Sequence, residues 1–61
     1  MELLHTFSDN NKMAKIYRLD VGAYFIRFHE NDVIGEYTVV KSEEEAEILA
    51  EDFVMDLGYT K

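Results

Sequence analysis

Two strand-like stretches on either side of a three-residue interruption constrain the fold of this chain most. Residues 13–19 and 23–29 are rich in aromatic and β-branched side chains, which favour extended strands. Between them, residues 20–22 end in Gly22. This is the position at which a three-residue hairpin loop commonly needs a left-handed backbone. The pattern therefore predicts an antiparallel hairpin.

The length of this loop decides which residues face each other. With three loop residues, Leu19 faces Ala23 and Ile16 faces Ile26. A two-residue loop would set Ile16 against Arg27, because a shift of one residue turns every side chain to the other face. We therefore expect the three-residue loop, whose hairpin presents one core face made of Ala14, Ile16, Tyr24, Ile26 and Phe28.

A third strand is expected after a turn centred on residues 31–32. A two-residue turn there sets Ile26 opposite Tyr37. On the other face it sets Arg27 opposite Glu36, and such a pair of opposite charges stabilises a sheet. Both observations favour the same register.

Residues 43–56 are predicted to form a helix. Ser42 is a favourable N-cap residue, and Glu45 three positions later completes a capping box. Gly58 follows where a left-handed residue commonly ends a helix. One side of the helix carries an apolar stripe at helical spacing, formed by Ala46, Leu49, Ala50, Phe53, Val54 and Leu57.

Together these elements predict an α+β fold. We expect a three- to four-stranded antiparallel meander sheet with one C-terminal amphipathic helix packed on one face, in the order ββββα. The weaker fourth strand is residues 3–7, at the edge of the sheet. The 61 residues are taken as a single domain, 1–61. A chain this short buries only about 60% of its unfolded surface, so self-association is a reasonable source of added stability.

The charge is concentrated on the predicted helix. The net charge is −7, and residues 42–57 hold many acidic residues but no Lys or Arg, while the remainder is balanced. Direct binding to nucleic acid is disfavoured, since phosphate contacts need a basic surface. Two interpretations stay open. The acids are a solvated face that keeps the protein soluble, or they form an acidic interaction surface of Glu43, Glu44, Glu47, Glu51 and Asp52. Such a surface would imitate nucleic-acid phosphates and block a basic DNA- or RNA-binding protein.

The sheet is predicted to have more apolar residues than one helix can cover. The face away from the helix would carry Met13, Tyr17, Leu19, Ala23, Phe25, Ile34 and Val40. A contiguous apolar patch of this kind usually marks an interface, and aromatic residues are enriched at interface hot spots. We therefore expect a homodimer or a complex with another protein through Tyr17, Leu19, Phe25 and Ile34.

Nothing in the sequence indicates an enzyme. No hydroxyl residue lies in a nucleophile-elbow pattern, and Ser42 is explained by helix capping. There is no cysteine, and neither His5 nor His29 has a carboxylate at a convincing ligand spacing. We expect no catalytic, cofactor-binding or metal-binding residue and no small-molecule substrate. The absence of a leader-like or membrane-spanning stretch predicts a cytoplasmic protein that does not bind membranes.

The stretch from Lys15 to Met55 resembles small acidic proteins of unassigned function from T4-like phages of marine cyanobacteria. The residues that carry this resemblance are segments 15–18 and 22–25, the turn from Phe28 to Asp32, and the helix segments 46–47 and 50–54. The resemblance implies a phage protein inside the host cell, acting on a host component. It implies no catalytic residues.

Overall fold

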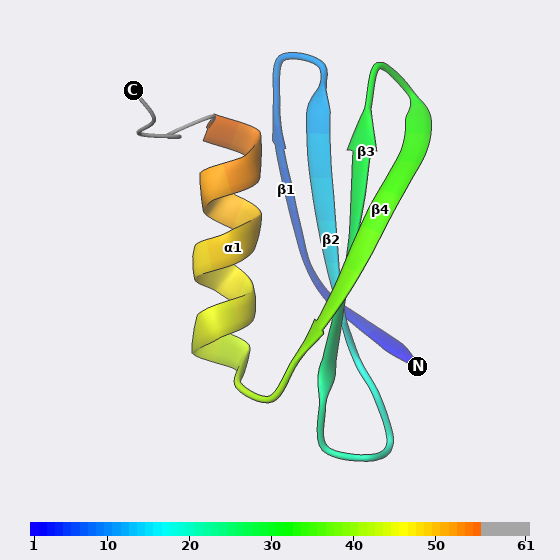
Figure 1. Ribbon diagram of the computed structural model, residues 1–61, viewed down its shortest axis with the longest axis vertical. Helices are drawn as coiled ribbons and strands as arrows, with labels where there is room; N and C mark the ends of the chain where they lie inside the picture. The colour runs from blue at the N-terminus through cyan, green and yellow to red at the C-terminus, as the bar shows by residue number, and fades with distance from the viewer. Residues whose placement is uncertain (56–61) are drawn as a thin grey trace.

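Four antiparallel strands and one helix form the protein, in the order ββββα that was predicted. The computed structural model describes residues 1–55. The strands lie side by side in chain order, with helix α1 (Glu43–Met55) across one face of the sheet (Figure 1). They are β1 (Glu2–Asp9), β2 (Lys12–Arg18), β3 (Tyr24–Glu30) and β4 (Val33–Val40). The fourth strand is thus confirmed as β1, at an edge of the sheet and longer than residues 3–7.

The β2–β3 hairpin has the predicted loop and register. Ile16 pairs with Ile26, and the Leu19 N–H donates a hydrogen bond to the Ala23 carbonyl at 2.9 Å. Gly22 has a φ of +81°, a conformation that glycine adopts without steric strain. The length of the loop therefore follows from its one glycine.

The β3–β4 register follows the prediction near the turn and departs from it beyond. Asn31 and Asp32 have φ angles of 57° and 66°, as a two-residue hairpin turn of the favoured hand requires. Past the turn, an irregularity between Arg27 and His29 adds one residue to β4. Such a bulge turns the following side chains to the opposite face.

The two predicted pairs beyond this bulge are therefore wrong. Arg27 lies opposite Tyr37 rather than Glu36, and Ile26 lies opposite Thr38 rather than Tyr37. Val40 was expected on the face away from the helix, but it is 8% exposed and belongs to the core. Beyond the bulge, each residue of β4 therefore lies on the face opposite to the one that was predicted.

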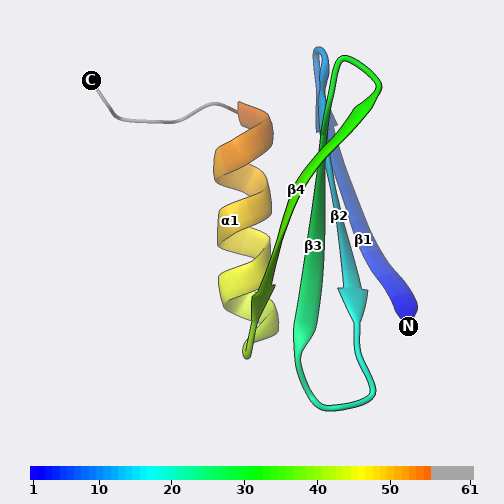
Figure 2. The same cartoon turned by 45° about the vertical axis from the view of Figure 1, so that its right-hand side comes forward.

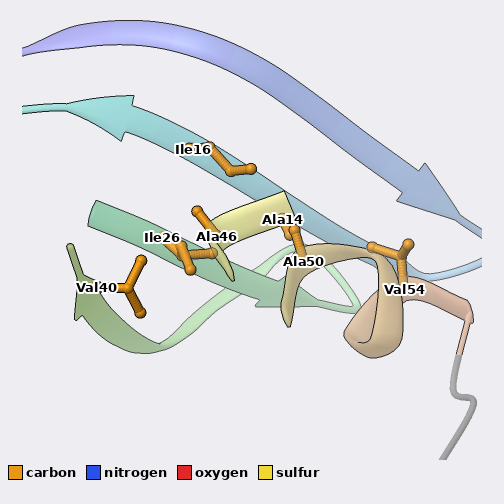
Figure 3. Packing of buried hydrophobic residues seen from close by; sticks show 7 residues of the cluster. All are labelled: Ala14, Ile16, Ile26, Val40, Ala46, Ala50 and Val54. Atoms are coloured by element: carbon orange, nitrogen blue, oxygen red, sulfur yellow. The ribbon is translucent and has the colours of Figure 1, made fainter. Parts of the chain in front are cut away.

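Close packing of the helix on the sheet gives a physical reason for this exchange. Ala46 and Ala50 of α1 are fully buried; Ala46 lies beside Ile26 and Ala50 beside Ala14 (Figure 3). Because alanine side chains are short, the helix backbone approaches the sheet closely, and this favours a small side chain opposite the buried Ile26. The smaller Thr38 occupies that position, and Tyr37 is left 61% exposed.

The core lies between α1 and the strands it crosses. Phe7, Tyr24, Phe28, Leu49 and Phe53 pack around its edge, with the rings of Phe28 and Phe53 4.7 Å apart. The fully or nearly fully buried residues are Ala14, Ile16, Ile26, Val40, Ala46, Ala50 and Val54.

The start of the helix and its apolar side agree with the sequence analysis. The Glu45 N–H donates a hydrogen bond to Ser42 Oγ at 3.2 Å, the first of the two capping-box bonds. Of the predicted stripe, Leu57 lies outside the described residues, as does Gly58. The other stripe residues are buried or half-buried against the sheet.

A second bulge lies in β1. His5 pairs with Ile16 and Leu3 with Tyr17, so one extra residue stands between the two pairs. His5 therefore faces the helix, whereas Leu3 faces the other side and is 50% exposed. The shifted end of β1 places Glu2 beside Arg18, where it accepts a hydrogen bond that raises the pKa of the Arg18 guanidinium.

Two isoleucines of the sheet provide a matched test of where the core lies. Replacing the fully buried Ile16 by valine is expected to lower the free energy of unfolding by about 1 kcal/mol, because a methylene is lost from close packing. The same change at Ile34, which is 60% exposed, should alter it by less than about 0.5 kcal/mol. Urea denaturation measures both values. Equal losses at the two positions would contradict this assignment of the core.

Candidate functional site

One face of the sheet is left uncovered by the described residues. Helix α1 lies on the opposite side, and no other element of residues 1–55 packs against the sheet (Figure 2). We call this surface the open face. By the observed register it carries Leu3, Thr6, Ser8, Met13, Lys15, Tyr17, Phe25, Arg27, His29, Ile34, Tyr37 and Val39.

The open face exposes an unusual amount of apolar surface. Its large apolar residues Leu3, Ile34, Tyr37 and Val39 are each at least half exposed. Soluble monomers rarely expose a contiguous apolar patch unless it binds something. A shallow hollow of about 350 Å³ lies within the face, and its lining is formed by Met1, Lys15, Tyr17, Phe25, Arg27, His29 and Ile34.

A row of three aromatic rings crosses the open face from β2 to β4. The rings of Tyr17 and Phe25 have centroids 5.9 Å apart, and those of Phe25 and Tyr37 are 5.2 Å apart. Tyr37 joins this row because of the β4 bulge. The sequence held one signal for that bulge, Gly35 inside a predicted strand, but the analysis of the sequence did not use it.

Two cations face each other at the centre of the open face. Lys15 of β2 lies directly opposite Arg27 of β3, an arrangement that destabilises a sheet. The Arg27 guanidinium is 5.2 Å from the ring centroid of Phe25 and 5.8 Å from that of Tyr37. Both distances are within the range of cation–π attraction.

No acidic residue balances this pair among the side chains that the register places on the open face. Glu36 was predicted to do so, but it instead lies beside Phe28 and Phe53, which pack on the helix side. The open face is therefore cationic, although the whole protein has a net charge of −7.

Of the four residues predicted to form the interaction face, three come together. Tyr17, Phe25 and Ile34 line the same hollow. Leu19 is half-buried and lies beyond the end of β2, in the hairpin loop. The sequence analysis missed Leu3, Tyr37 and Val39, since each reaches the open face through a bulge.

The predicted acidic surface is divided by the fold. Glu43 and Glu47 approach His5, with their Oε2 atoms 2.9 and 3.1 Å from the imidazole Nε2. Glu44, Glu51 and Asp52 are exposed to solvent. Glu43 and Glu47 also remain 45% and 43% exposed, so two of the five accessible carboxylates share their surface with a histidine.

Comparisons with known proteins return no match to this chain among protein-family models, curated proteins or solved structures. Within residues 1–55, the helix is too short and too polar to cross a membrane. The function is therefore inferred from the chemistry of these surfaces.

The opposed cations of the open face should lower stability. Replacing Lys15 by glutamate converts a like-charge pair into an attractive one, so the free energy of unfolding is expected to rise by about 0.5 kcal/mol. Lys15→Gln removes the repulsion alone and should give a smaller gain. Lys41→Glu changes the net charge equally, but it lies outside the strands and should give no gain. The urea concentration at the midpoint of unfolding compares the stability of the three variants. A loss of stability in Lys15→Glu would show that Lys15 supports folding.

Proposed function

We propose that this protein is a non-enzymatic interaction module that binds another protein through the open face. The observation that carries the proposal is the combination of an exposed aromatic row with two central cations in an acidic protein. Tyr17, Phe25 and Tyr37 offer rigid contact area of the kind found at binding hot spots. Lys15 and Arg27 stand opposite each other, at a cost to folding that a binding role would explain.

The central cations also favour a partner that differs from the chain itself. A symmetric dimer brings a surface against its own copy. A twofold axis through the centre of the open face would set Lys15 and Arg27 against the same residues, with no carboxylate among the strand residues that the register places on this face to compensate. We therefore infer a partner whose contact surface is apolar around one or two carboxylates. Arg27, whose guanidinium lies near the rings of Phe25 and Tyr37, can bind a carboxylate through two parallel hydrogen bonds.

The acidic helix does not prevent such a partner from binding. The outward-facing acids Glu51 and Asp52 are exposed on α1, on the other side of the sheet from the open face (Figure 2). A helix with side chains is about 10 Å across, and charges separated by more than about 8 Å are largely screened at physiological ionic strength. The local charge of the open face therefore governs the contact.

The resemblance to phage proteins suggests where the partner is found. We propose a host protein in the cytoplasm, in keeping with the implied action on a host component. Nucleic acid fits the open face less well, since two opposed cations give little phosphate contact in a protein with a net charge of −7.

The nucleic-acid mimic of the sequence analysis has less support. It uses the five helix carboxylates to contact a basic partner, and two of them, Glu43 and Glu47, already contact His5 within the chain. Its signature would be a basic partner that is released as salt is raised and that still binds when the open face is altered.

The first test is the mass of the protein in solution, by light scattering after size exclusion at low and high salt. A monomer is expected in both, because the open face is not complementary to itself. A dimer that persists at both salts and is lost in Phe25→Asp would assign the face to a second copy and overturn the proposed partner.

The second test compares two exposed isoleucines. Ile34 on the open face and Ile48 on the outer side of α1 are 60% and 52% exposed. The protein is immobilised and then exposed to a lysate of host cyanobacterial cells. A partner should be retained by the natural chain and by the Ile48→Asp variant. It should be lost with Ile34→Asp, because a carboxylate replaces part of the apolar contact. Equal retention by both variants would place binding elsewhere.

A further inference from the structure

A histidine and two glutamates from opposite ends of the sequence converge at one edge of the molecule. His5 lies on β1, and Glu43 and Glu47 lie on the first two turns of α1. The His5 Nε2 atom is 2.9 Å from Glu43 Oε2 and 3.1 Å from Glu47 Oε2. All three donor atoms lie within 4.8 Å of one another, and the side chains are 38%, 45% and 43% exposed.

The fold holds each of these side chains in place from a rigid element. His5 pairs with the fully buried Ile16 and therefore faces the helix. Glu43 and Glu47 are four residues apart, so they are neighbours on one side of α1. The buried Ala46 fixes the distance between that side of the helix and the sheet. The arrangement thus depends on the core rather than on mobile loops.

A single hydrogen bond from His5 does not neutralise the charge of the two carboxylates. The nitrogen that faces the two carboxylates carries either one proton or one lone pair. It can donate one good hydrogen bond, to Glu43 or to Glu47. The two carboxylates also repel each other across one helical turn. A divalent cation would accept the nitrogen lone pair and neutralise both carboxylates at once.

The distances between the donor atoms suit a first-row metal ion. Zinc binds histidine nitrogen and carboxylate oxygen at about 2.0–2.2 Å in tetrahedral geometry, which places neighbouring donors roughly 3.3–3.6 Å apart. The nitrogen–oxygen separations of 2.9 and 3.1 Å need to widen by about half an ångström to reach this range. An imidazole donor suits zinc and related transition metals, whereas Mg²⁺ and Ca²⁺ prefer oxygen ligands throughout.

We propose that His5, Glu43 and Glu47 form a binding site for a divalent transition-metal ion such as Zn²⁺. The three protein ligands leave coordination positions for water. A metal bound there joins the edge strand β1 to the start of α1, which are separated by 38 residues along the chain. In a small domain without cysteine, such a link supplies the kind of added stability that other small folds obtain from disulfides or metals.

The test measures the melting temperature of chelator-treated protein as Zn²⁺ is added, with Mg²⁺ in parallel. Zn²⁺ should raise the melting temperature in a saturable manner, because a ligand that binds only the folded state stabilises it. Mg²⁺ should have little effect. Titration calorimetry with Zn²⁺ should show one site per chain.

Substitutions locate the ion. His5→Gln, Glu43→Gln and Glu47→Gln should each weaken Zn²⁺ binding by about tenfold or more, since even residues behind metal ligands have effects of that size. His29→Gln and Glu51→Gln, which alter the other histidine and a helix acid outside the cluster, should bind as the natural protein does. Because removing one carboxylate relieves repulsion, Glu47→Gln should remain folded without metal, so a lost response there reports lost binding.

Two outcomes would overturn the proposal. One is the absence of any Zn²⁺-dependent change in melting temperature or heat. The other is a response that persists in His5→Gln and Glu47→Gln, or that His29→Gln removes. Neither outcome affects the proposed function, because the open face lies on the other side of the sheet from this cluster (Figure 2).

Discussion

The close contact between the alanines of α1 and the isoleucines of β2 and β3 is the interaction on which the rest of the structure depends. Ala46, Ala50, Ile16 and Ile26 are all fully buried. Small side chains bring the helix near the sheet, where interiors are packed too tightly for a large ring to be added. This contact favours the small Thr38 over Tyr37 opposite Ile26, and it holds the start of the helix where Glu43 and Glu47 approach His5.

The two edge strands carry the irregularities that give the surfaces their chemistry. Both β1 and β4 contain one extra residue relative to their neighbours, and bulges are common at sheet edges, where they re-aim side chains. In β4 the bulge moves Tyr37 to the open face. In β1 it moves Leu3 to that face while His5 stays turned to the helix. Both bulges therefore bring apolar side chains to the open face.

Both sites also place like charges close together. Lys15 opposes Arg27 on the open face, and Glu43 and Glu47 share one nitrogen of His5 at the edge of the helix. A sequence selected for stability alone would avoid such pairs, and departures from local rules are expected where a protein binds something. The two surfaces call for opposite ligands, a carboxylate on the open face and a cation at the helix.

The sequence by itself determined the order of the elements, the β2–β3 register and the buried side of the helix. These follow from local causes. Gly22 sets the length of the β2–β3 loop, Ser42 caps the helix, and the spacing of the apolar residues decides which side of the hairpin and of the helix is buried. Only the tertiary structure decided the face of Tyr37 and the meeting of His5 with Glu43 and Glu47. The first depends on the space beneath the helix, and the second on a contact across 38 residues. Neither quantity exists until the helix has packed on the sheet.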